Sequence, residues 1–232
     1  MNLIRIFFQI LKSAEQNKYF IDAIIDRLPV DIIISDNRFG CYSKKAHSVY
    51  MTHQVMIKLP IGFKMFESLG FLFHTMMIKK FNECWIPDFE GNNNLSGDLS
   101  HKFKLKTKTN FIGPFSRFEP AHEIREYEFD FCIILSGPEP NRTELEKIVL
   151  EKFSTITQRT IVVRGTPKDN MQFGYGNLQV YSHLPSHILY QKFLASKYII
   201  TRAGYTSIMD MFVLGRKTII IPTNDQPEQE YL

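Results

Sequence analysis

The segment RAGYTSIMD, residues 202–210, combines a glycine, two hydroxyls and a carboxylate at the start of an expected helix. Gly204 has no Cβ and therefore lets a ligand approach the backbone closely. Thr206 and Ser207 can cap the helix or donate hydrogen bonds to phosphate oxygens. Asp210 shares their helix face, where its carboxylate can accept hydrogen bonds from two adjacent ribose hydroxyls. A plain helix cap with a solvated aspartate is the alternative interpretation.

A second stretch of this kind, SGPEPNRTELEK, follows the apolar run at residues 130–136. Ser136 and Gly137 fall in the expected turn from strand to helix, which is a common place for phosphate binding. Asn141 can cap the next helix, and Glu144 three residues later completes a capping-box pattern. The stretch matches neither a Walker loop nor G-x-G-x-x-G, so an ordinary loop is the alternative.

Short apolar runs alternate with helical patterns along the chain, which favours an α/β fold with parallel sheets and helices on both faces. The run VDIIIS at residues 30–35 has the composition of a buried parallel strand. A charged, proline-containing stretch at 117–130 is expected to link two domains. The other expected strands cover residues 48–53, 83–87, 110–114, 130–136, 159–165, 178–183, 197–201 and 217–222, and the expected helices cover 142–153, 186–196 and 206–214.

The composition is that of an ordinary globular protein, with 44% hydrophobic and 22% charged residues in a chain of 232. The net charge of +4 comes from scattered Lys and Arg, so we expect no nucleic-acid partner. Cys41, Cys84 and Cys132 are far apart, which favours neither a zinc site nor a disulfide framework and is typical of the reducing cytosol. Residues 1–11 predict an amphipathic helix rather than a signal peptide, because no small-residue cleavage site follows them.

The most apolar segment covers residues 59–81. Charged residues such as Lys64, Glu67 and Lys79 interrupt it, so it does not predict a membrane span. It predicts either a core helix or a surface helix that contacts a membrane, because exposed apolar helices with basic flanks bind bilayer interfaces.

The stretch ITRAGYTSIMDMFVLGRKTIIIPT…QPEQEYL resembles the donor-binding signature of bacterial inverting GT-B glycosyltransferases of the MurG kind, in glycosyltransferase family 28. That signature consists of Arg-Ser-Gly, a hydroxyl, an acid, a strand ending in proline, and a glutamine-rich helix start. A phosphate loop after the first strand of the donor domain completes it. The matching residues are Arg202, Gly204, Ser207, Asp210, Pro222, Gln229 and Glu230, with Ser136 and Gly137 in the phosphate loop.

Several positions depart from the family. Asp210 stands where the family has glutamate, so its reach to a ribose is shorter. Pro138 and Pro140 replace further glycines of the phosphate loop. His53 falls where the family has a His-Glu-Gln-Asn stretch, but the family's first acceptor-domain strand and its glycine-rich loop have no counterpart.

The resemblance implies a GT-B fold, in which two Rossmann-like parallel-sheet domains face a cleft. Residues 1–118 would be the second half of an acceptor-binding domain, and residues 119–232 a UDP-sugar-binding domain that is incomplete at its carboxyl end. The expected reaction transfers a hexosamine, with N-acetylglucosamine as the expected sugar, to a lipid-linked or saccharide acceptor with inversion. No metal or other cofactor is expected. This chain alone is expected to be inactive, and to be cytoplasmic or peripheral on the cytoplasmic face of the inner membrane.

The resemblance also implies which residues form the site. His53 and Asp36 are the candidates for the general base that takes the acceptor proton. The expected donor-binding residues are Ser136, Gly137, His183, Leu184, Arg202, Gly204, Thr206, Ser207, Asp210, Gln229 and Glu230.

Two other functions stay open. A sugar-nucleotide 2-epimerase shares the fold, although its acidic-histidine site is not found here. A non-catalytic half of a split transferase, which binds a UDP-sugar or a membrane partner, is the other alternative, because a fold alone does not determine function. Retaining GT-B enzymes carry two glutamates near this helix, and the single Asp210 favours inversion instead.

Overall fold

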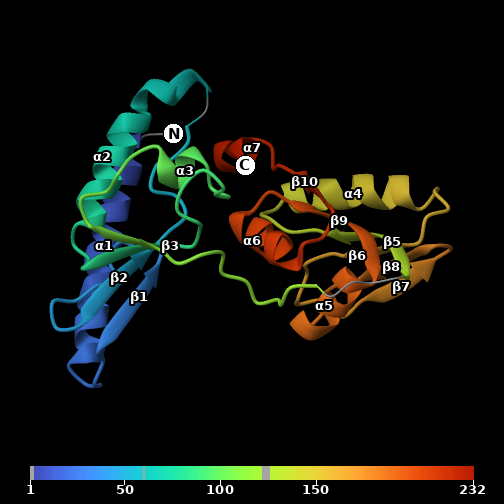
Figure 1. The fold of residues 1–232 in the computed structure, drawn as a ribbon, viewed down its shortest axis with the longest axis horizontal. Coiled ribbons are helices and arrows are strands. Elements are labelled where there is room, and N and C mark those ends of the chain that lie inside the picture. Colours follow the sequence, from blue (N-terminus) through green and yellow to red (C-terminus); the bar gives the residue numbers. More distant parts are fainter. Residues whose placement is uncertain (1–2, 60, 122–125) are drawn as a thin grey trace. The chain divides into compact units, whose positions relative to one another are not determined.

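The chain divides into two compact units, Met1–Gly113 (unit 1) and Pro114–Leu232 (unit 2), each with its own sheet in this computed structural model (Figure 1). The described residues are 3–59, 61–121 and 126–232. Residues 1–2, 60 and 122–125 fall in the expected amino-terminal helix, membrane-contact segment and linker, and lie outside the described part. The units divide before Pro114, whereas the sequence places the boundary after residue 118.

Unit 1 is a four-stranded parallel sheet in the order β1-β2-β3-β4. Its strands are β1 (Ile32–Asp36), β2 (His47–Met51), β3 (Glu83–Ile86) and β4 (Lys108–Phe111). Its helical elements are α1 (Leu3–Ile25), the 3₁₀ helix η1 (Ile61–Phe66), α2 (Glu67–Ile78) and α3 (Asp98–His101). The core consists of Tyr50, Val55, Ile78, Phe81, Cys84 and Ile86, so α2 and the two central strands supply most of it.

Strand β1 differs from its sequence prediction in one respect. The apolar run forms a parallel strand, but Ile32 and Ile34 are 58% and 53% exposed. The prediction of a buried strand is wrong because β1 is the edge of this sheet and pairs only with β2. An isoleucine run does not distinguish an edge position from a central one.

Unit 2 is a six-stranded sheet in the order β10-β9-β5-β6-β8-β7. All neighbouring strands are parallel except the pair β7 and β8. The strands are β5 (Phe129–Ile134), β6 (Thr160–Val163), β7 (Gln172–Tyr175), β8 (Leu178–Tyr181), β9 (Ser196–Arg202) and β10 (Thr218–Ile221). The helices are α4 (Asn141–Phe153), α5 (Ser186–Leu194), α6 (Tyr205–Leu214) and α7 (Pro227–Tyr231).

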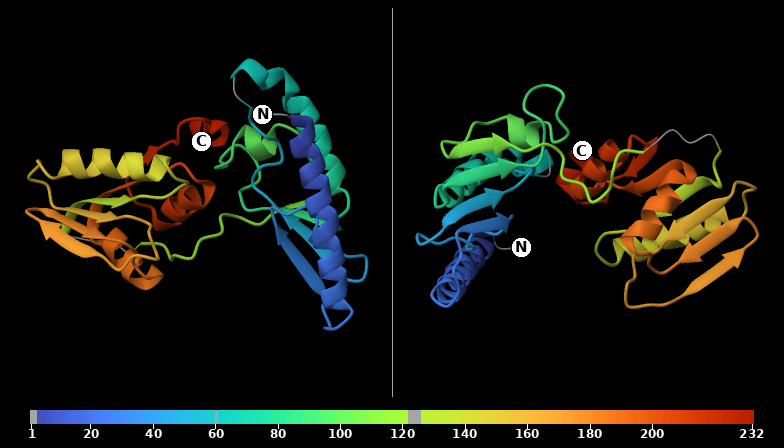
Figure 2. Two further views of the ribbon diagram at one scale, coloured as in Figure 1. Left: turned by 180° about the vertical axis from the view of Figure 1, so that it is seen from behind. Right: turned by 60° about the horizontal axis from the view of Figure 1, so that its bottom comes forward.

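Helices cover both faces of the unit 2 sheet, as the alternating pattern predicts (Figure 1 and Figure 2). One core cluster includes Phe193 of α5 and Leu214 of α6, and the other includes Val149 of α4. The two clusters lie on opposite faces of the sheet, because successive side chains of a strand alternate between faces. Within β5, Cys132 belongs to the first cluster and Ile133 to the second.

The beginning of the expected linker is part of unit 2. Phe118 is buried in the first core cluster, where its ring stacks on Tyr190 and meets Phe193 edge to face. The sequence pattern missed this anchor because charged residues surround it. The charged stretch therefore begins inside the fold, although part of it lies outside the described residues.

The three cysteines occupy different environments. Cys84 in β3 and Cys132 in β5 are fully buried, and burial raises the pKa of each thiol to about 12. Cys41 lies in the loop after β1 and is only half-buried. All three are free thiols.

Helix α1 packs very closely against the loop that follows β1. A Cβ placed on Gly40 would lie 2.1 Å from the carbonyl oxygen of Ala14 in α1. The contact is made by backbone atoms, which cannot move aside as a flexible side chain can. Gly40 is therefore required for the packing of this helix.

We expect Gly40→Ala to destabilise unit 1 by about 1–3 kcal/mol, the usual cost of overpacking. Trp85 is the only tryptophan of the protein and lies in β3, so its fluorescence during urea unfolding reports on this unit. Gly70→Ala in α2 is the control, because its Cβ would meet nothing within 4 Å and alanine favours a helix. Equal unfolding midpoints for Gly40→Ala and the parent protein would contradict the close contact.

Candidate functional site

The carboxyl edge of the unit 2 sheet contains a topological switch point. Strand β5 has β9 on one side and β6 on the other, and all three run parallel. Ligands of open α/β sheets bind beyond the strand ends at such a point. The residues there are Ser136 and Gly137 after β5, and Ala203 and Gly204 after β9.

Two glycines leave room at this edge. Gly137 has φ +107°, a conformation that other residues rarely adopt, and a Cβ there would approach only Thr223 Oγ1, at 4.0 Å. Gly204 has ordinary extended backbone angles, and its Cβ would approach only Ser207 Oγ, at 4.0 Å. The chain itself therefore does not need a glycine at position 204. The free space lies where a ligand could contact the backbone.

Helix α6 begins directly at this edge. Gly204 is its N-cap residue, and no side chain caps it. The expected capping by Thr206 and Ser207 is therefore wrong, because the helix starts earlier, at Tyr205. Thr206 is exposed and Ser207 half-buried, and the N–H groups of the first turn point towards the edge. This arrangement suits an anionic ligand.

Helix α4 is capped differently from the sequence prediction. Pro140 is its N-cap residue and Asn141 its first residue, so the expected capping box of Asn141 and Glu144 is not formed. Instead, the carboxylate of Glu139 accepts a hydrogen bond from the backbone N–H of Thr143 at 3.2 Å. The turn that contains Pro138 and Pro140 shifts the helix start by one residue, so that Glu139 takes the capping role.

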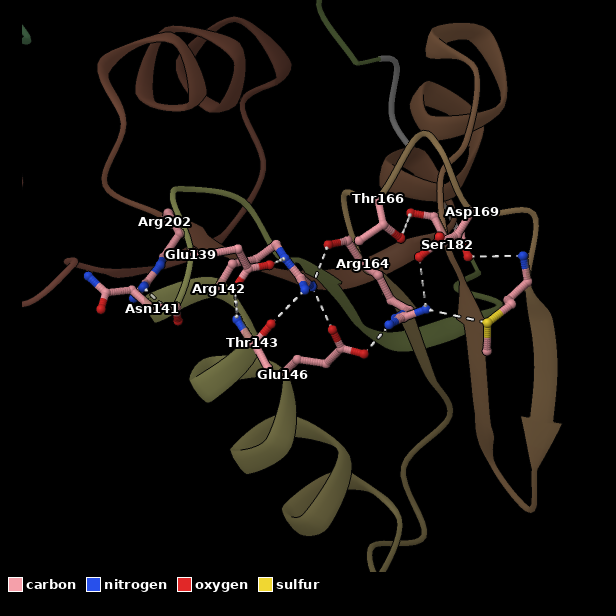
Figure 3. A network of polar contacts seen from close by, with 11 residues as sticks. Glu139, Asn141, Arg142, Thr143, Glu146, Arg164, Thr166, Asp169, Ser182 and Arg202 are labelled. Atoms are coloured by element: carbon pink, nitrogen blue, oxygen red, sulfur yellow. Dashed lines mark hydrogen bonds and ion pairs between the residues drawn. The ribbon is translucent and has the colours of Figure 1, made fainter.

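A partly buried network of charges supports the same loop (Figure 3). Arg142 donates to Glu139 and to Glu146, and Glu146 also accepts from Arg164, which follows β6. Arg142 and Glu146 are each 8% exposed. Two cations and two carboxylates therefore share short contacts, and they connect α4, the Ser136–Pro140 loop and the carboxyl end of β6.

Asp210 is almost completely buried. Its Oδ1 accepts a hydrogen bond from Ser116 Oγ at 2.7 Å, and Nε of Arg117 lies 3.8 Å from Oδ2. Burial raises the pKa of the Asp210 carboxyl, while Ser116 and Arg117 oppose that shift. The backbone of Arg117 also donates a hydrogen bond to this carboxylate, which thus holds the Ser116–Arg117 segment on α6.

Arg202 is also buried, and it joins two loops. Its guanidinium donates to the carbonyl of Pro222 at 3.0 Å. It also donates to the carbonyl of Asn141 at 3.3 Å (Figure 3). Its Nε has no hydrogen-bond partner among the described residues, and desolvation lowers its pKa. In this arrangement Arg202 fixes the loops after β10 and before α4.

Gln229 and Glu230 both contact the loop before α7. Gln229 Oε1 accepts hydrogen bonds from the backbone N–H of Thr223 at 3.0 Å and from its hydroxyl at 2.7 Å. Glu230 Oε1 accepts from the N–H of Asp225 at 3.2 Å. The expected contact of these two side chains with a donor sugar stays a prediction, and in the described state they order the loop that approaches Gly137.

The remaining expected residues lie at strand ends. His183 is exposed and Leu184 is buried in the core, and both follow β8. In unit 1, Asp36 is the exposed last residue of β1, and His53 follows β2, which is paired with β1 in parallel. Asp36 and His53 therefore belong to the carboxyl edge of the unit 1 sheet. Their role as a base stays a prediction.

Three contact residues at this site escaped the sequence prediction. Ser116 and Arg117 reach Asp210 from a segment far away in sequence, and Thr223 lies beside Gly137 and Gln229. No local pattern marks them. Tertiary contacts bring that segment to unit 2: Phe118 packs into the first core cluster, and the backbone N–H of Phe115 donates to Met209 Sδ of α6 at 3.4 Å. Among the described residues, no three His, Cys, Asp or Glu side chains gather closely enough to hold a metal ion.

Comparisons with known proteins find one matching family profile and solved structures with a similar fold. Residues 143–231 match the profile of the glycosyltransferase family 28 C-terminal domain. A structure described as the glycotransferase of kitacinnamycin covers 99% of this chain, with TM-score 0.58 and 12% identity. The spinosyn forosaminyltransferase SpnP covers 95%, with TM-score 0.50 and 13% identity. A search of curated protein sequences gives no match.

This chain covers 67% and 66% of those two structures, so it spans about two thirds of their length. At such low identity the two likenesses establish the fold alone. The chain has the mixed α/β, parallel-sheet fold of GT-B glycosyltransferases, and its residues 143–231 are similar to the carboxyl-terminal domain of glycosyltransferase family 28.

Proposed function

We propose that unit 2 binds the nucleotide-sugar donor of a glycosyl transfer, and that this donor is a UDP-sugar. The observation that carries the proposal is the free space at Gly137 and Gly204, on the ends of adjacent strands at the switch point. The match of residues 143–231 to the family 28 domain supports it, because domains of that family bind nucleotide-sugar donors.

In this proposal the first turn of α6 and the hydroxyl of Ser207 bind the diphosphate. They stabilise the charge that develops as the bond between sugar and UDP breaks, which makes a metal unnecessary. The acceptor oxygen attacks from the opposite side of the anomeric carbon, so the configuration inverts, and a base takes the acceptor proton. His53 or Asp36 is our candidate for that base. The single acid of α6, Asp210, fits inversion.

The sugar and the acceptor are finer proposals. We propose a hexosamine, N-acetylglucosamine in particular, and a saccharide or lipid-linked acceptor, from the MurG-like spacing of Gly204, Ser207, Asp210 and Gln229. The two structural neighbours are named for other compounds, kitacinnamycin and spinosyn. The unfolding temperature of the protein is measured with UDP-N-acetylglucosamine and with other UDP-sugars. A ligand that binds the native state raises this temperature, so the measurement ranks the donors.

Two alternatives make different predictions. A non-catalytic binding half would bind UDP without transferring or hydrolysing the sugar. An epimerase would convert UDP-N-acetylglucosamine into its 2-epimer without an acceptor. We propose that this chain by itself binds donor but does not transfer it. Product analysis by mass spectrometry and NMR identifies an epimerase by its 2-epimer, and sugar transfer by this chain would contradict both the proposed inactivity and the non-catalytic half.

We also propose that unit 1 contacts a membrane through η1 and α2, which would bring a lipid-linked acceptor to the protein. Leu69, Leu72 and Met76 form a stripe of exposed apolar side chains at the i, i+3 and i+7 spacing of one face of α2, and the exposed Met65 of η1 precedes them. The opposite face already packs into the core. Among the described residues, no helix has the length and hydrophobicity to span a bilayer.

Basic residues accompany this apolar stripe. Lys64 precedes it, and Lys79 and Lys80 follow the carboxyl end of α2; all three are exposed. Lysines near an anionic surface add attraction to the burial of apolar side chains. This combination supports an anionic lipid surface as the partner of the stripe.

We expect the double variant Leu69→Glu/Leu72→Glu to bind vesicles of anionic phospholipid roughly tenfold or more weakly than the parent protein, because two apolar contacts become charged. Co-sedimentation with vesicles measures this partitioning. Leu28→Glu is the matched control, since Leu28 is equally exposed but lies outside the stripe. Equal binding by the parent and the double variant would contradict membrane contact through this helix.

We expect Asp210→Ala to weaken UDP binding roughly tenfold to a hundredfold, because a charged hydrogen-bond acceptor to ribose typically contributes ~1.5–3 kcal/mol. Calorimetry with UDP and with 2′-deoxy-UDP tests the contact itself. The parent protein should discriminate the two ligands, and the variant should bind them equally.

Ser116→Ala and Glu151→Ala are the controls. Ser116→Ala removes the hydrogen bond that holds Asp210 but leaves the carboxylate, so discrimination between the two ligands should persist. Glu151 is exposed on α4 and should have no effect. If a folded Asp210→Ala protein still distinguishes UDP from its deoxy form, then Asp210 does not bind the ribose.

A further inference from the structure

Unit 1 contains a cavity of about 390 Å³ between α1 and the loop that follows β1. One face of α1, within residues 9–17, forms one wall, and residues 37–40 form the other. The volume lies near the lower end of the ~300–1,000 Å³ that is usual for small-molecule sites. The cavity adjoins the carboxyl end of β1, the edge at which parallel sheets bind ligands.

The polar lining of this cavity is rich in groups that bind hydroxyls and anions. Gln9, Asn17 and Asn37 contribute carboxamides, Ser13 a hydroxyl, and Arg38 a guanidinium, while no Asp or Glu of the described residues lines the cavity. In the described part of the chain, no side-chain hydrogen bond or ion pair involves Gln9, Ser13, Asn17 or Arg38. Their hydrogen-bonding capacity is therefore available to a ligand.

The loop wall is held in place before any ligand arrives. Asn37 adopts φ +55°, and its Oδ1 accepts hydrogen bonds from Tyr50 Oη at 3.0 Å and Thr52 Oγ1 at 3.3 Å. Tyr50 is itself fully buried. The hydroxyl of Ser35 donates to the carbonyl of Arg38 at 2.6 Å. Because the oxygen of Asn37 is occupied, its NH₂ group remains as a donor.

The other wall is fixed by the contact between Gly40 and Ala14, which leaves no room for a Cβ. Helix and loop therefore meet through backbone atoms of Ala14 and Gly40, which both line the cavity. The positions of Ser13 and Asn17 on α1 are set relative to Arg38 by this contact. A site with rigid walls loses less entropy when it binds.

We propose that this cavity binds an anionic saccharide, that is, a sugar carrying a phosphate or a carboxylate. Carboxamides both donate and accept, which matches the vicinal hydroxyls of a sugar. Arg38 would pair with the negative group, since guanidinium binds phosphate and carboxylate with two parallel hydrogen bonds. No acidic side chain in the lining would repel such a group. The claim that this sugar is the acceptor of the reaction rests on the proposed function. The claim that it binds to unit 1 does not.

Calorimetry of the full chain with glucose 6-phosphate, glucuronate, glucose and inorganic phosphate tests the proposal. We expect glucose 6-phosphate or glucuronate to bind at least tenfold more tightly than glucose or inorganic phosphate. Arg38→Gln should lower the affinity for the anionic sugar at least tenfold. Arg27→Gln, an exposed arginine outside the cavity, should leave it unchanged.

Asn17→Asp provides an independent variant that hardly changes the shape of the helix surface. Its negative charge should weaken binding of the anionic sugar and leave any binding of glucose unchanged. The Trp85 unfolding curve checks that each variant is folded, and UDP affinity, measured on the same samples, reports separately on unit 2.

The proposal is overturned if no anionic sugar binds at millimolar concentration, if inorganic phosphate binds as tightly as glucose 6-phosphate, or if Arg38→Gln and Arg27→Gln behave alike. Loss of the proposed donor function would look different: UDP would fail to bind while the anionic sugar still bound to unit 1.

Discussion

In a parallel sheet every strand ends at the same edge, and both candidate sites depend on this geometry. Strands β5 and β9 pair in register from Phe129 with Ser196 to Ile133 with Ile200, so the loops that follow them begin side by side. Gly137 and Gly204, far apart in sequence, therefore belong to one site. In unit 1 the same pairing of β1 with β2 brings Asn37 next to Thr52.

The loops at these edges are rigid because buried polar groups hold them. In unit 2, Arg142, Glu146 and Arg164 share contacts in an almost dry environment, where removing one partner would leave an uncompensated charge. In unit 1, Tyr50 holds Asn37 in a left-handed conformation. The hydrogen bonds themselves bury no apolar surface, although the ring of Tyr50 belongs to the core of unit 1. Each set of contacts fixes the position of one loop. That position matters more for ligand binding than for the stability of the fold.

The strands and helices followed from the sequence wherever apolar runs are short and flanked by turn residues. Strand β7 escaped prediction because all four of its residues are exposed, so no apolar pattern marks it. The exposure of Ile32 and Ile34 could not be predicted, since position in a sheet depends on pairing and not on residue type. The sequence pattern also failed to predict the start of α4, where the carboxylate of Glu139 caps the helix in place of Asn141.

The residues of the candidate site could likewise be predicted only in part. Gly204, Ser207 and Asp210 could be located because they are close in sequence and begin one helix. Ser116 and Thr223 could not, because each becomes part of the site only through a tertiary contact, with Asp210 and with Gln229. The cavity in unit 1 could not be predicted from the sequence either. Its walls come from α1 and from a loop on the far side of β1, and no spacing in the sequence joins them.

The unequal burial of the three thiols has a practical consequence. Thiolates are the reactive form, and burial keeps Cys84 and Cys132 protonated far above neutral pH. Cys41 alone is partly accessible, and it directly follows Gly40, on the loop that forms one wall of the cavity. The natural sequence thus offers a single attachment point for a fluorophore or spin label, placed where a ligand entering unit 1 would change its signal.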